Sequence, residues 1–305
     1  MSSETFASLE SENIYSCFNS DAGLLTLQGS QVELRRRLDA LFCSWAEVVG
    51  AIEYSFPPVL SVYSLDLADY FSSFPHLATL TTQIDSNNEG MKRFVDSTRN
   101  ERLTEVDQNY LTPARYVLPS AACYAVYNHL SNKKLQNDLF ITVCSPCFRQ
   151  ESIYKAGERQ WTFHMREIVC IGRQETVRNF LNTYRQLITE ILDRAKLPFQ
   201  LREATDPFFD KRDPALILQK LEPLKYEFLY RDRLAITSLN FHRKFFGDRF
   251  NIQDCTGEPA YTGCVAFGLE RWLSACIREY GQNWENLPAV LQKKEPEVRS
   301  QESGE

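Results

Sequence analysis

The stretch from residue 147 to 169, "CFRQESIYKAGERQWTFHMREIV", restricts the fold of this 305-residue chain more than any other. Two segments around it, "DLFITVCSPCFRQE" and "RQWTFHMREIVCIG", alternate apolar and polar side chains, and the polar loop "SIYKAG" between them ends on glycine. This pattern predicts an antiparallel β-hairpin. Charge nevertheless stands among its aromatic residues, whereas a strand that only packs keeps charge off its inner face. The hairpin therefore needs a ligand or a water-facing side. The charged residues are Arg149, Glu151, Arg159, Arg166 and Glu167.

Side chains alternate across a strand, so each arm of the hairpin presents every second residue on one face. If both faces point inward, one surface holds a guanidinium, two carboxylates and aromatic rings. A guanidinium binds phosphate oxygens in pairs and a flat ring suits a purine, so this surface favours a nucleotide. A salt-bridged strand face open to water is the alternative, and a lone "RxE" would favour it. The two faces consist of Cys147, Arg149 and Glu151 in the first arm and Trp161, Phe163, Met165 and Glu167 in the second.

The rest of the chain predicts an α+β domain with a mainly antiparallel sheet flanked by helices. Apolar residues recur at helical spacing from Gln31 to Val49 and stop at Gly50. "IEYSFPPVLSVYSL" predicts a strand that its two prolines confine to an edge or a bulge. Helices are expected near residues 121–130 and 174–195, and further strands at "FQLREA", "KYEFLYR", "LAITSLNFH" and "FNIQD". "YTGCVAFGLERWLSACIREY" turns from a strand into a helix at Gly268.

Composition predicts one soluble, cytoplasmic domain between two mobile ends. We expect an N-terminal arm over residues 1–30, the folded domain over 31–285 and a polar tail over 286–305. No run approaches the ~18 apolar residues of a membrane span, and the polar start does not resemble a signal peptide. Nine cysteines in a chain of this length indicate thiols rather than bridges. A net charge of −6 and a pI near 5.5 argue against a large RNA-binding surface.

Two segments resemble the conserved motifs of class II aminoacyl-tRNA synthetases. "CFRQE", a loop and "RQWTFHMRE" are similar to motif 2, and "GCVAFGLERW" is similar to motif 3, although Ala266 stands where a glycine is common. The helix of residues 31–49 and the strand through Pro57 and Pro58 lie where motif 1, the dimer-forming element, is expected. The resemblance covers about residues 31 to 285 and implies the catalytic domain of that class.

Three further residues resemble the zinc site of the archaeal-type seryl-tRNA synthetases. Cys123 in "SAACYAVY", Glu167 in "FHMREIV" and Cys264 in "YTGCVAFG" match the two thiolates and one carboxylate of that branch. Spacing alone would not indicate a metal, and each cysteine taken singly reads better as a buried apolar residue. The resemblance implies one Zn²⁺ per chain with an open fourth position, which receives the α-amino group of the substrate.

The chain also resembles the amino acid:carrier protein ligases, which are synthetase-like enzymes that load an amino acid onto a carrier protein. About 30 residues precede the first helix, so we expect no tRNA-gripping domain, and "ATDPFF" and "LNFHRKFFGDRF" are similar to segments of those ligases. The resemblance implies that ATP activates a small amino acid, glycine, alanine or serine, as an aminoacyl-adenylate. The phosphopantetheine thiol of an acyl carrier protein then displaces AMP. It also implies a homodimer, and we expect the apolar face of the helix from Leu34 to Val49 to need a second copy as its partner.

The motif match assigns a role to each candidate residue. The resemblance places Arg149 at the α-phosphate and the substrate carboxylate, Glu151 and Phe163 at the adenine, and Arg159 and Arg271 at the γ-phosphate, with Glu258 as a ligand of Mg²⁺. Asp210 would recognise the substrate ammonium, although an aspartate near a proline is commonly a turn residue. Asn240 and His242 alternate onto one strand face and would line the pocket, and a structural histidine is the alternative.

The acceptor should dock on a locally basic surface, because carrier proteins present acidic helices. The segment of residues 211–233 is the best candidate, and its expected docking residues are Lys211, Arg212, Lys220 and Lys225. An ordinary solvated helix is the alternative. Two other functions remain open: a regulatory paralogue without catalysis, and a tRNA synthetase that needs a separate RNA-binding partner. The paralogue is disfavoured because the candidate arginines and zinc ligands are all present. The acidity of the chain disfavours tRNA.

Overall fold

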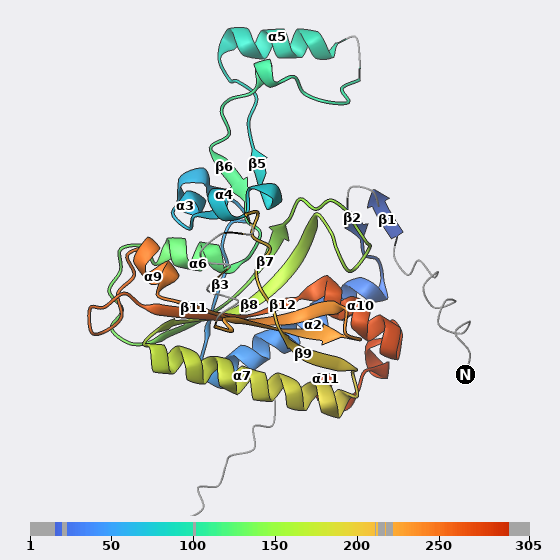
Figure 1. Ribbon diagram of the computed structural model, residues 1–305. Coiled ribbons are helices and arrows are strands. Elements are labelled where there is room, and N and C mark those ends of the chain that lie inside the picture. The colour runs from blue at the N-terminus through green and yellow to red at the C-terminus, as the bar shows by residue number, and fades with distance from the viewer. Residues whose placement is uncertain are drawn as a thin grey trace, which may run out of the picture.

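A seven-stranded sheet forms the centre of the computed structural model, which describes residues 16–19, 23–99, 102–210, 212, 217 and 222–292 (Figure 1). Its strand order is β3-β7-β8-β12-β11-β10-β9. Every neighbouring pair is antiparallel except β3 and β7, which are parallel. The predicted α+β class with a mainly antiparallel sheet is thus confirmed. The strands are β3 Ile52–Tyr54, β7 Leu139–Phe148, β8 Thr162–Gly172, β12 Tyr261–Gly268, β11 Leu234–Arg243, β10 Lys225–Tyr230 and β9 Phe199–Glu203.

Helices cover both faces of this sheet (Figure 1). One face packs against α2, α7, α10 and α11, and the other packs against α6 and α9. Each helix buries the apolar side that its sequence pattern supplies. The bounds are α2 Ser30–Ala46, α7 Gln174–Ala195, α10 Leu269–Tyr280, α11 Ala289–Gln292, α6 Cys123–His129 and α9 Phe245–Arg249.

Strand β8 shows how the alternation of side chains divides the molecule into two cores. Ile168 and Cys170 belong to the core that contains α2, α7 and α10, whereas Met165 and Val169 belong to the core that contains α6 and α9. Successive side chains point to opposite faces of a sheet, so Glu167 lies on the α6 side. Polar groups on that side can therefore approach α6 while the opposite side packs against α2.

The hairpin and its neighbours form as predicted. Strands β7 and β8 are antiparallel from the pair Phe148 and Thr162 to the pair Leu139 and Ile171. Helix α7 covers the expected residues, and β12 turns into α10 at Gly268. The expected face is corrected in one respect, because β7 ends at Phe148. Arg149 and Glu151 therefore lie in the connection between the strands rather than on a strand face.

Four other expectations differ from the structure. "IEYSFPPVLSVYSL" is split, since β3 joins the central sheet while β4 (Leu60–Ser61) joins a small sheet with β6 (Tyr116–Leu118) and β5 (Thr79–Thr81). "FNIQD" contributes only two isolated bridges, from Gln253 to Lys134 and to Pro259. Part of the expected N-terminal arm forms a strand pair, β1 (Ser16–Asn19) with β2 (Leu24–Thr26). The expected tail also packs, because Leu287 and Leu291 are buried in the core. The folded domain therefore continues at least to residue 292.

The apolar side of α2 is covered by the chain itself. Leu34, Leu38, Phe42 and Trp45 are at most 1% exposed and pack beside α10 and β12. We expected this side to need a second copy, and that reason for a homodimer is wrong. The homodimer itself stays a prediction.

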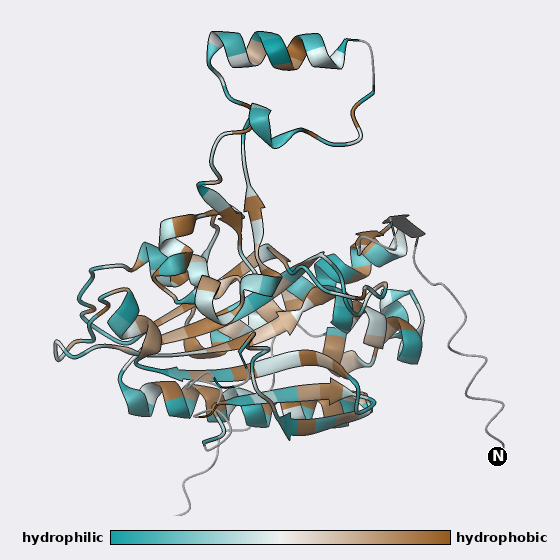
Figure 2. Cartoon of the chain, turned by 45° about the horizontal axis from the view of Figure 1, so that its top comes forward, coloured by the Kyte–Doolittle hydropathy of each residue, from teal (hydrophilic) through white to brown (hydrophobic). Residues whose placement is uncertain are grey.

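A smaller layer lies above the α6 face and continues into a projecting arm (Figure 1). The layer contains the small sheet, α3 (Val62–Asp66) and α4 (Tyr70–Ser73). The arm carries α5 (Asn88–Thr98), which is predominantly hydrophilic, whereas apolar residues gather in the body of the molecule (Figure 2). In the part of the chain that the structure describes, no helix has the length and apolar character needed to cross a membrane.

Candidate active site

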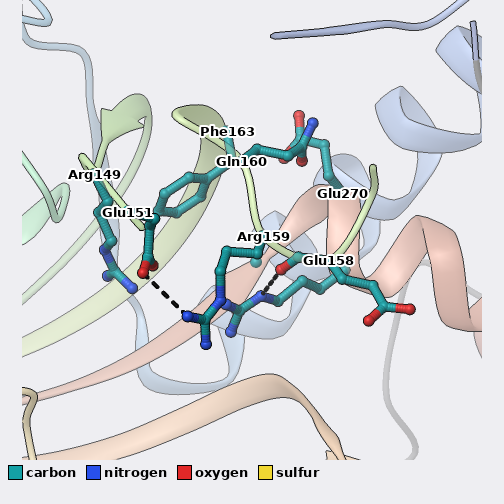
Figure 3. Close-up of a pocket in the computed structure, with 9 residues that line it drawn as sticks. Arg149, Glu151, Glu158, Arg159, Gln160, Phe163 and Glu270 are labelled. Carbon is teal, nitrogen blue, oxygen red and sulfur yellow. Dashed lines mark hydrogen bonds and ion pairs between the residues drawn. The ribbon is translucent and has the colours of Figure 1, made fainter. Parts of the chain in front are cut away.

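A pocket lies where β7 ends, where β8 begins and where β12 turns into α10 (Figure 3). The hairpin connection contributes one wall, and the first turn of α10 contributes another. The lining residues are Arg149, Glu151, Glu158, Arg159, Gln160, Phe163, Gly268, Glu270 and Arg271. The pocket therefore contains all five residues that the motif match assigned to the phosphates or the adenine of ATP. These are Arg149, Glu151, Arg159, Phe163 and Arg271. Arg271 reaches the pocket because β12 ends at Gly268 and α10 begins at the next residue. Arg271 therefore lies within the first turn of the helix, close to the end of the strand.

Two of the pocket arginines are held by neutral backbone carbonyls. Arg149 donates from Nε to the carbonyl of Ser120 at 3.1 Å. Arg271 donates from Nε to the carbonyl of Glu158 at 2.8 Å and from Nη1 to the carbonyl of Ala235 at 3.0 Å. A carbonyl orients a guanidinium without neutralising it, so the charge remains available to an anion. Two fixed guanidiniums aimed into one pocket are an arrangement suited to phosphate.

Burial, together with the neighbouring Arg149, lowers the pKa of Arg271 to about 10. Removing a guanidinium from water disfavours its charged form, and a second cation adds to that cost. Arg271 still carries its proton at neutral pH. An anionic ligand would relieve the repulsion between these two arginines, and this relief would favour its binding.

The remaining contacts shape the other end of the pocket. The guanidinium carbon of Arg149 lies 5.0 Å from the ring centre of Phe163, and Arg159 pairs with Glu151 at 3.3 Å (Figure 3). A flat ring beside a cation is a surface on which a nucleobase can stack. Trp161 is directed elsewhere, because its indole nitrogen donates to Thr79 at 3.1 Å.

Sequence reasoning missed Glu270, a buried carboxylate of the pocket. Its Oε2 accepts from the backbone nitrogen of His164 at 2.8 Å, and its Oε1 lies 3.0 Å from Nδ1 of His164. Arg35 of α2 lies 3.6 Å from the same carboxylate. The position of Glu270 directly before Arg271 in "GLERW" was the available signal. Its partner Arg35 lies 235 residues earlier, and this pairing could not be read from the sequence.

A second cluster lies on the α6 face of the sheet, where the ligand atoms of Cys123, Glu167 and Cys264 are all within 4.8 Å of one another. Cys264 faces Val169 across β12 and β8, so it is the diagonal neighbour of Glu167 on one face. Cys123 opens α6 above them. Residues 44 and 97 positions apart thus meet because two strands and one helix converge.

Glu167 divides its two oxygens between a helix end and the cluster. Oε1 accepts from the backbone nitrogens of Ala122 at 2.8 Å and Cys123 at 3.3 Å, at the start of α6. Oε2 is buried and has no hydrogen-bond partner within the described residues. An unpaired carboxylate oxygen in a buried site is costly unless a cation binds it.

The donor set fits zinc. Two thiolates and a carboxylate are common Zn²⁺ ligands, and three protein ligands leave a fourth position for a substrate. The hydrogen bond with Cys264, followed by burial, raises the pKa of the Cys123 thiol well above its usual value. A bound cation reverses this effect because it stabilises the thiolate.

Asn240 and His242 both approach this cluster from β11. Asn240 donates from Nδ2 to Sγ of Cys264 at 3.4 Å, and Nε2 of His242 lies 3.8 Å from the same sulfur. His242 also contacts Tyr127 and Thr262 through Nδ1. Burial lowers the pKa of His242 to about 4, so its ring is neutral at pH 7. We expected both residues to line the substrate pocket; they lie beside Cys264 instead, and their role in substrate binding stays a prediction.

The structure does not bring Glu258 or Asp210 to either site. Glu258 precedes β12, whose eight residues separate it from the pocket by roughly 25 Å. Its side chain is 70% exposed and pairs with Lys244. Asp210 is exposed and accepts from the backbone nitrogen and guanidinium of Arg212, as a turn residue does. The assignment of Glu258 is therefore corrected, because this separation keeps it from a phosphate bound in the pocket, whereas the role of Asp210 in substrate recognition stays a prediction.

The expected docking residues are only partly visible. Lys211 and Lys220 lie outside the described residues. Arg212 is exposed. Lys225 is not a docking residue, because its side chain is 15% exposed and lies between Asp206 at 2.8 Å and Glu227 at 3.2 Å. Its charge is used inside the protein.

Comparison with known proteins places this geometry in a defined class. The model of the tRNA synthetase class II core domain (G, H, P, S and T) matches residues 106–280, more than half of the chain. The seryl-tRNA synthetase of M. kandleri, solved with A. aeolicus tRNASec, has the same fold, with a TM-score of 0.77 and 19% identity over 89% of this chain and 56% of its own. The chain therefore has the catalytic core of a class II synthetase.

The curated relatives narrow the class. Amino acid–(acyl-carrier-protein) ligase 1 of Bradyrhizobium diazoefficiens is 34% identical over 84% of this chain and 79% of its own length. Ligase 2 of the same bacterium is 32% identical over 75% and 70%. The chain belongs to this family of amino acid–(acyl-carrier-protein) ligases. A type-2 serine–tRNA ligase of Methanococcus maripaludis is 24% identical over 81% of this chain, which spans about half (51%) of that protein.

Proposed function

We propose that this chain activates glycine, alanine or serine with ATP and transfers it to the phosphopantetheine thiol of an acyl carrier protein. The observation that carries the proposal is the position of two sites along one strand. Phe163 of the pocket and Glu167 of the cluster lie on the same face of β8, four residues apart, which is roughly 13 Å. A small amino acid bound at the cluster through its amino group would direct its carboxylate toward Arg149.

In the first step, a carboxylate oxygen of the amino acid attacks the α-phosphorus of ATP, and the bond to the pyrophosphate oxygen breaks. We assign Arg149 to the α-phosphate and the carboxylate, and Arg159 and Arg271 to the outer phosphates. These residues neutralise and position the reactants, which is the main demand of phosphoryl chemistry. Phe163 stacks on the adenine, and Glu151 accepts a hydrogen bond from it.

In the second step, the thiolate of the carrier attacks the carbonyl carbon of the adenylate, AMP leaves, and a thioester forms. Zn²⁺ bound by Cys123, Glu167 and Cys264 would supply an open coordination position for the α-amino group. Asn240 and His242 stand beside Cys264 and limit the space there. Mg²⁺ accompanies the ATP. The cluster would hold the amino group of the amino acid through Zn²⁺, while the arginines position and neutralise the phosphates during activation.

The proposal predicts a specific pattern of activity. ATP–pyrophosphate exchange measured with each of the twenty amino acids should be highest with glycine, alanine or serine, because the cluster is buried and flanked by ring side chains. The enzyme should then load the phosphopantetheine form of a carrier protein and leave tRNA uncharged. Highest exchange with a large or aromatic amino acid refutes the substrate assignment. Charging of tRNA without carrier loading identifies a tRNA synthetase instead.

We place the carrier on the segment that begins at Lys211 and Arg212 and includes Lys220. Carrier proteins are acidic, and rim charges act mainly on the association rate. The triple charge reversal of these residues to Glu should slow carrier loading several-fold at low salt and leave ATP–pyrophosphate exchange unchanged. Loading at the wild-type rate across a range of salt concentrations would place the carrier elsewhere.

We also propose a homodimer, and the supporting observation is an exposed edge strand rather than the apolar side of α2. Strand β3 is an edge of the central sheet, and Ile52 on it is 56% exposed. Exposed apolar edge strands readily pair with another chain. Light scattering at micromolar concentration should give a dimer, which Ile52→Glu should weaken by about tenfold or more in dissociation constant. Ile153→Glu, on the hairpin connection, is the control and should remain dimeric. A wild-type monomer would contradict the proposal.

A further inference from the structure

The connection between β7 and β8 is fastened to one face of α10. Ser274 donates from its hydroxyl to the carbonyl of Gly157 at 2.8 Å, and Arg271 donates to the carbonyl of Glu158 at 2.8 Å. Arg278 donates to the carboxylate of Glu158 at 2.7 Å. Positions 271, 274 and 278 are separated by three and four residues, so they share one face of the helix. Three successive contacts therefore run along α10 to the same two residues of the connection.

The carboxylate of Glu158 is the hub of this attachment. Its Oε1 contacts Nη2 of Arg278 at 2.7 Å, Nη2 of Arg233 at 3.2 Å and Nζ of Lys155 at 3.2 Å. The Glu158 side chain is only 9% exposed and points away from Arg149 and Glu151 (Figure 3). One carboxylate thus joins the connection itself, α10 and the turn between β10 and β11. Charge-assisted hydrogen bonds of this kind are stronger than neutral ones and fix geometry.

Glu158 also fixes the positions of Arg159 and Arg271, the two pocket arginines that we assign to the outer phosphates of ATP. Arg159 follows Glu158 directly, and its backbone nitrogen donates to the carbonyl of Lys155 at 2.8 Å. The side chain of Arg271 is oriented by the carbonyl of Glu158. Movement of Glu158 would displace both guanidiniums together. Pocket geometry must hold within about 0.5 Å for full effect, so a loosened connection weakens the contacts that these arginines make.

We propose that Glu158 is a positioning residue that holds Arg159 and Arg271 in place for the outer phosphates of ATP. It touches no substrate itself. This inference rests on the proposed function only for its kinetic consequence, because the attachment of the connection can be measured without any ligand.

The test uses Glu158→Gln, which keeps the shape and removes the charge. The KM for ATP in pyrophosphate exchange should rise about tenfold or more, with the KM for the amino acid within about twofold. Amide hydrogen exchange of residues 150–160 in the ligand-free protein should become faster. Glu158→Asp should recover part of both effects. Glu279→Gln is the matched control, because Glu279 lies on α10 and pairs with Arg231 without contacting the connection.

Several results would overturn the inference. An unchanged KM for ATP in a folded Glu158→Gln enzyme is one, and an equal rise of both KM values is another, since it indicates general destabilisation. If Glu158→Gln does not fold, Arg278→Gln removes the shortest contact from the surface side and should give the same selective change. If the wild type shows no ATP–pyrophosphate exchange with any amino acid, the proposed function fails. Amide hydrogen exchange alone then tests whether Glu158 holds the connection in place. Equal rates of amide hydrogen exchange at residues 150–160 in Glu158→Gln and Glu279→Gln then show that Glu158 does not hold the connection on α10.

Discussion

Cys123→Ala should abolish zinc binding and lower ATP–pyrophosphate exchange by about a hundredfold or more. Loss of one of three protein ligands leaves a buried thiolate and a carboxylate with too few donors for tetrahedral zinc, and even changes outside the ligand set cost 10- to 100-fold. Cys264→Ala should behave alike. Metal analysis of protein purified without added zinc should give about one zinc per wild-type chain and under about a tenth of that in both variants.

The chain offers a matched control for this experiment. Cys147 is a buried free thiol in the same core on the α6 side of the sheet. Cys147→Ala therefore removes an equivalent side chain and should keep its zinc. Equal zinc in the wild type, Cys123→Ala and Cys264→Ala would reject the metal assignment. Loss of zinc in all variants, including Cys147→Ala, would indicate that the fold rather than the ligand set was disturbed.

Arg271→Ala should lower kcat/KM for ATP in pyrophosphate exchange by about 10²–10³-fold, the usual effect of removing one fixed donor from a site of developing charge. The guanidinium is oriented by two neutral carbonyls, and within the described part of the chain it forms no ion pair, so its loss removes positive charge from the pocket. Amino acid binding should change little, because Glu167 of the cluster lies four residues along β8 from Phe163 of the pocket, which is roughly 13 Å.

Arg231→Ala provides the comparison for this second prediction. Arg231 pairs with Glu279 and is half-exposed, so its removal costs little in stability and should leave exchange near the wild-type rate. Thermal unfolding of both variants shows whether the fold is kept. An Arg271→Ala enzyme that is folded and retains more than about a third of the wild-type kcat/KM would contradict the phosphate role.

Much of the central architecture could be predicted from local pattern. The hairpin, helix α7 and the turn at Gly268 each depend on residues close together in the sequence, where periodicity and glycine supply direct signals. The strand expected at "FNIQD" was wrong because only two of its five residues, Phe250 and Ile252, favour a strand, and Phe250 caps the end of helix α9 and packs into the core with Phe246 of that helix.

Site residues could be predicted from the sequence where they belong to a recognisable motif. They could not be predicted where the only signal was a charged side chain. Arg149 and Arg271 lie in recognisable segments and meet in one pocket. Lys225 looked like a surface cation, but its partner Asp206 is 19 residues away, on a segment that folds back over β10. The resemblance implied that Glu258 is a ligand of Mg²⁺, and it lies only a few residues before motif 3 in the sequence. A strand carries residues apart by about 3.3 Å each, and sequence closeness did not become spatial closeness.

The alternation along β8 makes this strand intolerant of changes in length. Arg166 lies on the α2 side, where it pairs with Asp39 at 2.8 Å and with Glu53 at 2.6 Å, and Glu167 lies on the opposite side with the thiols. Inserting one residue between Phe163 and Arg166 would exchange the two faces. A guanidinium would then stand between Cys123 and Cys264, and a carboxylate would be left against two others. A substitution in β8 changes one side chain on one face of the sheet. The insertion or deletion of a single residue moves every following side chain to the opposite face.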